Sequence, residues 1–376
     1  MRAEMVLPAL PAAGMEIMVA NLTRGLVRRG HEVGVTCLEA GGTIADELRA
    51  EGIRVAVVPT PGLRTILRPV RLSAWLQHLQ PDVVHVHTGV WLKGARAARR
   101  AGAARVVHTM HGWLDDARWY TPLLDRWAAR STDRVVAVSE ALREYLARRV
   151  GLPATQTAVI PNGIDAALFR PGPRRGGWRA TLGIPHDATV IGSVARLTPV
   201  KDHALLLAAL ALVRKRISGA VLVVAGDGAL RQALETQVAE LRLAHAVRFL
   251  GETRDVATLY REFDLLALSS RSEGTSISLL EGMASGVCVV ATAVGGTPAL
   301  LGAGRFGRLV PYGDPHTLAA ALVDLLQDQR TRERLAAAAR AEVLATYSLD
   351  AMITAYEREY GWTTQRRRVA LGAGAS

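Results

Sequence analysis

The chain has 376 residues, of which 49% are hydrophobic and 21% charged, and its net charge is +12. This length favours two domains over one core, and the composition excludes an intrinsically disordered chain. No apolar run approaches the ~18 residues of a membrane span. Only two cysteines occur, Cys37 and Cys288, both within apolar runs. They indicate buried thiols in a reducing compartment, and they exclude a disulfide framework and a CxxC metal site.

The basic charge is carried almost entirely by arginine, since only three of the 46 basic residues are lysines. A basic excess suits anionic lipid, phosphorylated substrates or nucleic acid. Nucleic acid is disfavoured because no helix-turn-helix, zinc finger or aromatic-rich stacking motif occurs.

Short apolar runs alternate with longer amphipathic segments along the chain. Six runs in the first half are typical of buried parallel strands, at residues 31–38, 52–59, 81–87, 104–110, 133–139 and 156–161. Six more follow, at residues 188–195, 219–226, 245–251, 264–270, 286–292 and 307–311. This repetition predicts two doubly wound α/β domains.

The domain boundary is predicted where proline and glycine cluster between residues 162 and 177. We predict an N-terminal domain, a C-terminal domain, a helix that packs back towards the N-terminal domain and a disordered tail, at residues 1–168, 169–346, 347–363 and 364–376.

Ligands of doubly wound sheets bind at the carboxyl ends of the strands, so residues just after each run are candidates. Gly14 opens the first helix and would let a ligand approach the backbone. His111 follows the run at 104–110 and could donate to a hydroxyl or phosphate, although a loop histidine without a role is the alternative. His85 and His87 share one face of a strand end, but no third metal ligand is evident, so we predict no metal site.

Residues 63–79 alternate arginines with apolar residues. On one helix they would form a basic and an apolar stripe, as in helices that lie on a membrane surface. A helix packed on the sheet with solvated arginines is the alternative.

Arg196 and Lys201 lie five residues apart in the loop after the run at 188–195. Two cations at a strand end can hold a diphosphate and stabilise charge that develops on it. Two solvated loop cations are the alternative. A Gly-rich turn at 223–228 also follows a strand, where it would allow a nucleotide to approach the backbone.

The stretch from Glu273 to Glu281 has a carboxylate at each end. Glu273 precedes a helix that is predicted to begin near Ser276, whose N-terminal amides suit a phosphate. Glu281 lies more than a turn inside that helix, so the two cannot share one proton. Two carboxylates that accept from hydroxyls of one elongated ligand fit the spacing better, and a helix cap with an ordinary helix residue is the alternative.

Five segments together resemble retaining glycosyltransferases of the GT-B fold, in glycosyltransferase family 4 and its relatives. They are residues 14–33, 133–146, 159–171, 195–210 and 272–300, the last with the family's E-x7-E signature. The resemblance covers nearly the whole chain and implies two Rossmann-like domains that face a central cleft. It departs from the family at Ala13, where a second glycine is usual, and at Thr275, where phenylalanine is frequent.

The resemblance also implies roles for single residues. Arg196 and Lys201 would hold the donor diphosphate, Glu273 would contact hydroxyls of the transferred sugar, and Glu281 would bind the ribose hydroxyls. His111 would lie beside the transferred sugar and complete the catalytic set. The backbone that lines the sugar and the phosphates would be that of Gly14, Gly274, Thr275, Ser276 and Ile277, and base recognition would involve the backbone near Leu250.

The expected function is retaining transfer from a nucleoside-diphosphate sugar to an acceptor hydroxyl, in the synthesis of a polysaccharide, a glycolipid or a glycosylated natural product. No metal or other cofactor is expected. The expected location is cytoplasmic, extending to peripheral contact with the anionic inner face of the plasma membrane if the acceptor is lipid-linked. A sugar-nucleotide epimerase of the same architecture and a non-catalytic nucleotide-sugar binder are the alternatives.

Overall fold

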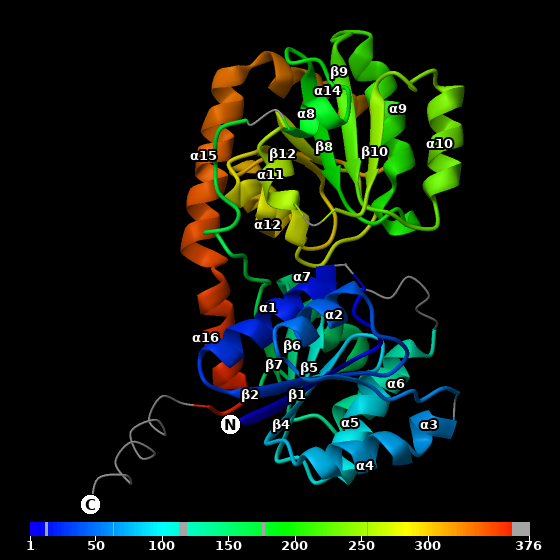
Figure 1. Ribbon diagram of the computed structural model, residues 1–376, viewed down its shortest axis with the longest axis vertical. Coiled ribbons are helices and arrows are strands. Elements are labelled where there is room, and N and C mark those ends of the chain that lie inside the picture. The colour runs from blue at the N-terminus through cyan, green and yellow to red at the C-terminus, as the bar shows by residue number, and fades with distance from the viewer. Residues whose placement is uncertain (12–13, 63, 113–118, 175–176, 254, 363–376) are drawn as a thin grey trace, which may run out of the picture. The chain divides into compact units, whose positions relative to one another are not determined.

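The computed structural model describes residues 1–11, 14–62, 64–112, 119–174, 177–253 and 255–362 (Figure 1). It divides into two compact units, Met1–Gly163 with Leu349–Ser376, and Ile164–Ser348. Ala13 and the predicted tail at 364–376 lie outside the described residues. None of the described helices is both long and apolar enough to span a membrane.

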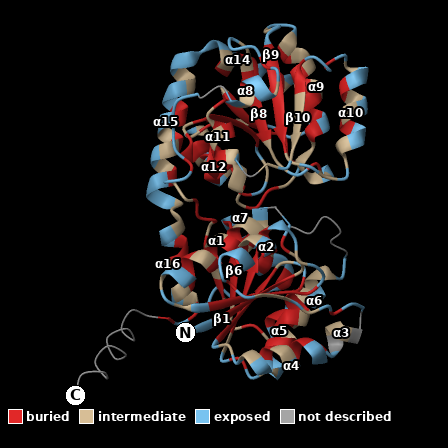
Figure 2. Ribbon diagram, in the orientation of Figure 1, coloured by how far each residue is buried: buried red, intermediate tan, exposed pale blue. Residues whose placement is uncertain are grey.

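The first unit is built on a seven-stranded sheet in the order β3-β2-β1-β4-β5-β6-β7, with every neighbouring pair parallel. Its strands are β1 Arg2–Leu7, β2 Glu32–Cys37, β3 Val55–Val57, β4 Val83–His87, β5 Arg105–Met110, β6 Arg134–Ala137 and β7 Thr157–Val159. The central strands are buried along nearly their whole length, because helices cover both faces of the sheet (Figure 2).

One face of this sheet carries α1 Gly14–Arg28, α2 Thr43–Ala50 and α16 Leu349–Glu359 (Figure 1). The other carries α3 Arg64–Leu67, α4 Val70–Leu79, α5 Trp91–Arg100 and α6 Thr121–Ala129, while α7 Glu140–Tyr145 runs on into the π-helix η1 Leu146–Val150. Arg29, just after α1, forms ion pairs with Asp350 and Glu357 of α16. The last helix is thereby tied to the first.

The prediction of one continuous amphipathic helix over residues 63–79 is wrong. The segment forms α3 and α4, which are separated at Arg68 and Pro69. Proline lacks the backbone N–H that a continuous helix would need there. In α4 the side chains of Leu72 and Leu76 are fully buried in the core, so its apolar stripe faces inward as in the packed alternative.

The second unit is built on a six-stranded parallel sheet in the order β10-β9-β8-β11-β12-β13. Its strands are β8 Thr189–Val194, β9 Ala220–Ala225, β10 Val247–Gly251, β11 Leu265–Leu268, β12 Cys288–Thr292 and β13 Arg308–Val310. The prediction of two doubly wound parallel sheets is therefore confirmed, and each of the twelve predicted apolar runs contains a strand.

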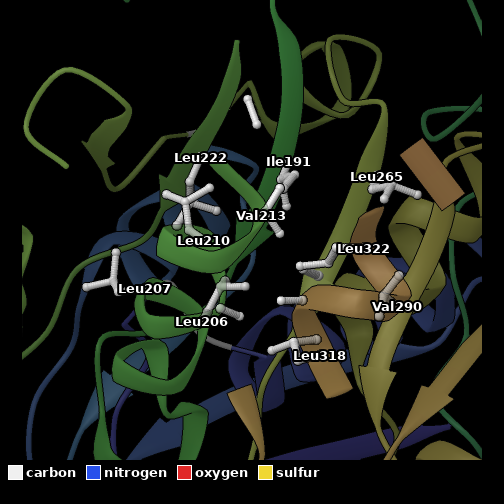
Figure 3. Packing of buried hydrophobic residues seen from close by; sticks show 14 of the residues in the cluster. Ile191, Leu206, Leu207, Leu210, Val213, Leu222, Leu265, Val290, Leu318 and Leu322 are labelled. Carbon is white, nitrogen blue, oxygen red and sulfur yellow. The ribbon is translucent and has the colours of Figure 1, made fainter. Parts of the chain in front are cut away.

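Helices cover both faces of the second sheet as well. On one face lie α9 His203–Arg214, α10 Arg231–Glu240 and α14 Pro315–Gln327, where Leu206 and Leu210 of α9 meet Leu318 and Leu322 of α14 and Ile191 of β8 (Figure 3). On the other lie α11 Val256–Tyr260, α12 Ile277–Ala284 and α15 Gln329–Thr346. The remaining helices are short: α8 Gly177–Thr181, η2 Pro199–Lys201, α13 Thr297–Leu300 and η3 Gly302–Gly304.

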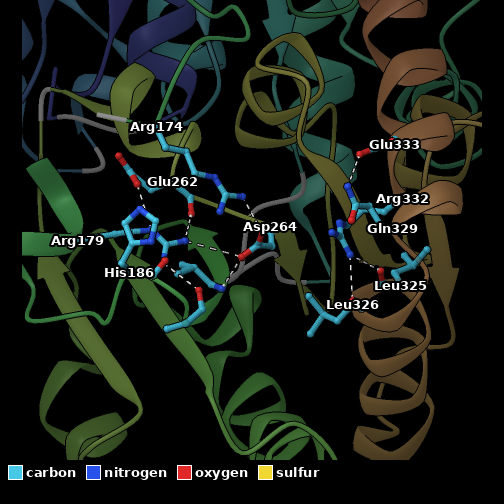
Figure 4. Close-up of polar contacts among 12 residues, drawn as sticks. Arg174, Arg179, His186, Glu262, Asp264, Leu325, Leu326, Gln329, Arg332 and Glu333 are labelled. Carbon is cyan, nitrogen blue, oxygen red and sulfur yellow. Dashed lines mark hydrogen bonds and ion pairs between the residues drawn. The ribbon is translucent and has the colours of Figure 1, made fainter. Parts of the chain in front are cut away.

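A buried ionic network lies at the amino ends of β8 and β11 (Figure 4). The guanidinium of Arg179, in α8, donates to Glu262 and to the carbonyls of Pro185, His186 and Ala188. This network is a structural feature, because ligands of such sheets bind at the opposite, carboxyl edge.

In each sheet the strand order runs backwards along the chain on one side and forwards on the other, with one point of reversal. The reversal falls between β1 and β4 in the first unit and between β8 and β11 in the second. At such a topological switch point the loops after the two strands diverge to opposite faces and leave room for a ligand. The loops after β8 and β11 carry most of the sequence-predicted site residues, including Arg196, Lys201 and Glu273.

Candidate functional site

The loops after β8 and β11 are bound to one another by hydrogen bonds. The hydroxyl of Ser269, just after β11, donates to the carbonyls of Lys201 and Asp202 at 3.1 and 2.7 Å. The amide of Arg271 donates to the carbonyl of Val200 at 2.8 Å. These bonds fix the position from which Lys201 projects, at the amino end of α9.

Lys201 and Glu273 meet in an ion pair at this switch point. The ammonium of Lys201 lies 2.6 Å from Oε1 of Glu273, and the two side chains are 19% and 7% exposed. The hydroxyl of Ser270 donates to the same carboxylate oxygen at 2.6 Å. A charge-assisted pair that is this shielded from water is stronger than a surface ion pair.

The two carboxylate oxygens of Glu273 differ in their hydrogen bonding. Within the described residues Oε2 receives no hydrogen bond, whereas Oε1 has two. The carbonyl of Glu273 accepts from the amide of Gly296 at 3.0 Å, which holds the backbone in place. The carboxylate is thus oriented before any ligand arrives.

The helix α12 begins directly after this loop, with Ser276 as its N-cap. The Ser276 side chain makes no capping hydrogen bond, so the amides of the first turn keep their donors. Gly274 is buried, and Thr275 and Ile277 are half-buried. An open helix N-terminus attracts anions, and here it follows the loop that carries Glu273.

Arg196 is exposed in the loop after β8, and its side chain forms no hydrogen bond or ion pair with the described part of the chain. Its backbone is held by the Gly-rich turn after β9, where Leu197 donates to the carbonyl of Asp227 at 2.9 Å. A Cβ on Gly226 would lie 2.1 Å from the carbonyl oxygen of Ala195. Because Gly226 has no side chain, the turn after β9 can pack closely against the Arg196 loop. The sequence alone did not reveal this contact.

Glu281 lies inside α12 and is 6% exposed. The hydroxyl of Tyr260 donates to its Oε2 at 2.8 Å. Burial raises the pKa of the Glu281 carboxyl to about 7, and the bond from Tyr260 offsets part of that effect. Glu273 and Glu281 thus have separate partners, as their spacing predicts.

The raised pKa of Glu281 predicts a loss of stability as the pH increases. Between the ordinary value of 4.5 and about 7 the unfolded chain releases this proton while the folded protein keeps it, so a higher pH favours unfolding. The loss should be on the order of 3 kcal/mol. Urea unfolding at pH 5 and pH 8 should show a larger drop for the wild type than for Glu281→Gln. Equal drops in the free energy of unfolding for the two proteins would contradict a raised pKa of Glu281.

In the first unit, His111 follows β5 and is half-buried. Its Nε2 lies 3.0 Å from Nδ1 of His87, at the end of β4. Burial lowers the pKa of His111 to about 3, so the ring is neutral at physiological pH. Gly14, the first residue of α1, is exposed, and Leu250 in the second unit is half-buried in β10.

Several supporting residues escaped the sequence analysis. Ser269 and Ser270 position the Lys201–Glu273 pair, and Tyr260 anchors Glu281. The paired serines that end the run at 264–270 were a usable signal, because ligands of parallel sheets bind where the strands end. Nothing near Tyr260 in the sequence points to a partner 21 residues away.

Family models match both halves of the chain. "Glycosyltransferase Family 4" matches residues 12–168, and "Glycosyl transferases group 1" matches residues 175–342. The D-inositol 3-phosphate glycosyltransferase of Mycobacterium tuberculosis is 32% identical over 402 aligned residues, which cover 95% of this chain and 82% of that protein. The chain belongs to the group 1 glycosyltransferases of family 4.

Solved structures agree with this family fold. Anabaena HepE, solved in complex with UDP and glucose, superposes on this chain with a TM-score of 0.86 at 24% identity. The superposition covers 96% of this chain and 100% of the HepE chain. The sucrose-phosphate synthase of Thermosynechococcus elongatus gives 0.80 at 22% identity, with 99% and 100% covered. At these identities the likeness shows the GT-B fold. The predictions of the family, the fold and a glycosyltransferase enzyme are confirmed.

Proposed function

We propose that this glycosyltransferase moves a sugar from a nucleoside-diphosphate sugar to an acceptor hydroxyl, with retention at the anomeric carbon. The observation that carries the proposal is the Lys201–Glu273 pair, which lies at the switch point of the second sheet and precedes the open N-terminus of α12. One cation and one oriented carboxylate are what a sugar diphosphate needs, because it combines an anionic and a hydroxyl-rich part.

In the proposed mechanism the bond from the anomeric carbon to the leaving phosphate oxygen breaks, and a bond to the acceptor oxygen forms on the same face. The acceptor proton passes to an oxygen of the leaving diphosphate. Negative charge grows on that diphosphate, and Lys201, Arg196 and the α12 amides would stabilise it. One N–H of the Lys201 ammonium donates to Glu273, and the other two remain to donate to phosphate. These groups supply the charge that a metal would supply elsewhere, so the proposal includes no metal.

The other residues have separate proposed contacts. Glu281 would accept from the ribose hydroxyls, and the backbone near Leu250 would face the base. Gly14 would meet the phosphates and His111 a hydroxyl of the transferred sugar. The proposal names a hydroxyl acceptor, and the mycobacterial relatives make an inositol phosphate the first one to test. UDP is likewise the first nucleotide to test, because HepE was solved with UDP and with UDP-glucose.

The two carboxylates are expected to differ in their kinetic roles. Glu273→Ala should lower kcat about 10- to 100-fold, because a hydrogen bond to a charged group contributes about 1.5–3 kcal/mol. Glu281→Ala should mainly weaken nucleotide binding and raise KM. Steady-state kinetics with calorimetric nucleotide titrations would separate the two effects. A Glu281→Ala variant with normal nucleotide affinity would contradict the ribose assignment.

The donor can be found by thermal shift with UDP, GDP, ADP and their sugars, with and without EDTA. We expect one nucleotide class to stabilise the protein, unaffected by EDTA. A non-catalytic binder would be stabilised without transfer to any acceptor, and an epimerase would interconvert the donor sugar without an acceptor.

Product anomers analysed by NMR would test retention, and an inverted anomer would contradict it.

A further inference from the structure

Asp202, which lies between Lys201 and α9, has an unusual backbone conformation. Its φ is 43° and its ψ is 55°, in the left-handed region. A residue with a Cβ is disfavoured there, because the Cβ comes too close to a carbonyl oxygen, so the conformation needs support from its surroundings. These two angles set the direction of the preceding residue, Lys201, relative to α9. The approach of the Lys201 ammonium to Glu273 therefore depends on them.

Donors from three residues hold Asp202 in this conformation. Its Oδ1 accepts from the amide of Leu205 at 3.2 Å, which caps α9, and its carbonyl accepts from the hydroxyl of Ser269 at 2.7 Å. Its Oδ2 accepts from the hydroxyl of Tyr312 at 2.7 Å. Because Leu205 and Tyr312 bind different oxygens, the carboxylate is fixed in its rotation as well as in its position.

Tyr312 reaches Asp202 from a distant strand of the sheet. It follows β13, and both β11 and β12 lie between β13 and β8. The two residues meet because α9 and α14, which follow β8 and β13, pack against each other on one face of the sheet (Figure 3). Nε of Arg271 donates to the Tyr312 oxygen at 3.3 Å. A guanidinium only donates and a carboxylate only accepts, so the single hydroxyl proton of Tyr312 points to Asp202.

We infer that Tyr312 is a positioning residue for Lys201, which acts by holding Asp202 in the left-handed conformation. The ammonium of Lys201 then meets a ligand from one fixed direction. The effect on catalysis rests on the proposed function of Lys201, whereas the effect on its position does not. A glycine at position 202 would adopt the same conformation without this support, because it has no Cβ, and it would still be a tolerated N-cap for α9.

Tyr312→Phe removes the hydroxyl and keeps the ring. It should lower kcat about three- to tenfold, because the lost hydrogen bond is made to a charged group. KM should change less, since Lys201 acts on charge that develops in the transition state. Asp202→Gly should rescue this loss, so the double variant should be faster than Tyr312→Phe. A normal kcat in Tyr312→Phe, or a double variant as slow as Tyr312→Phe or slower, would overturn the inference.

The reactivity of Lys201 gives a readout that needs no substrate. The chain has only three lysines, so limited acetylation with acetic anhydride followed by peptide mass spectrometry gives a rate for each. We expect Lys201 to react severalfold faster in Tyr312→Phe than in the wild type, because its loop opens more often, and to become slow again in the double variant. Lys215, exposed at the other end of α9, is the internal reference. An unchanged rate at Lys201 would overturn the inference.

Tyr347→Phe is the matched control. Tyr347 is half-buried at the end of α15, and its hydroxyl forms no hydrogen bond with the described part of the chain. Its kcat and its Lys201 reactivity should equal those of the wild type. The same loss of kcat in Tyr347→Phe as in Tyr312→Phe would make the loss a general effect of removing a hydroxyl and would overturn the inference. If the transferase assignment failed, the acetylation rates would still decide whether Tyr312 holds Lys201.

Discussion

Replacing Lys201 by alanine is expected to reduce kcat by about a hundred- to a thousandfold, because a donor aimed at developing charge is lost. The change also removes the partner of the Glu273 carboxylate, which would keep only the hydroxyl of Ser270. The first effect concerns charge that develops on the leaving diphosphate in the transition state, and the second concerns the carboxylate that would orient the transferred sugar, so KM should change less than kcat. Steady-state kinetics with the donor that the thermal-shift panel identifies would measure the split.

Lys215→Ala is the matched control for this prediction. Lys215 is exposed at the carboxyl end of α9, the same helix that begins just after Lys201, and its loss changes the net charge equally. Its kcat should equal that of the wild type. Circular dichroism and the unfolding midpoint of Lys201→Ala should also match the wild type within a few degrees. A Lys201→Ala enzyme with near-normal kcat would refute the assignment of Lys201.

Arg179→Ala is expected to destabilise the protein by about 3–5 kcal/mol. Arg179 is 4% exposed and donates to three carbonyls and to Glu262. Alanine would remove those donors from the interior while the Glu262 carboxylate stays there. The unfolding midpoint should fall by about 6–20 °C.

Arg174→Ala is the control in the same network (Figure 4). Arg174 pairs with Asp264 at 2.6 Å, but its side chain is 46% exposed. Removing this surface pair should cost about 0–1 kcal/mol. Calorimetry of both variants would test the comparison, and similar midpoints for Arg179→Ala and Arg174→Ala would contradict the argument from burial.

The architecture was predictable because parallel strands that are buried on both faces must be apolar along their length. The runs containing β8 and β11 end within one or two residues of the observed strands, so the residues after them lie at the carboxyl edge of the sheet, as predicted. The helix start at Ser276 was predictable for the same reason, since it follows a polar loop.

The contacts within the site were not predictable. Lys201 and Glu273 are 72 residues apart, and only the adjacency of β8 and β11 in the sheet brings their loops together. The prediction of a continuous helix across Pro69 failed because the periodicity of the side chains does not register the missing N–H of proline, which interrupts the helix there. The partner of His87 also depends on strand order, which a single sequence does not state.

The most direct test of the account is the release of nucleoside diphosphate from a panel of UDP-, GDP- and ADP-sugars, measured for the wild type, Lys201→Ala and Lys215→Ala with an acceptor present. The account predicts release from one nucleotide class by the wild type and by Lys215→Ala, and a loss of at least about a hundredfold in Lys201→Ala. Release that Lys201→Ala retains at the wild-type rate would contradict it.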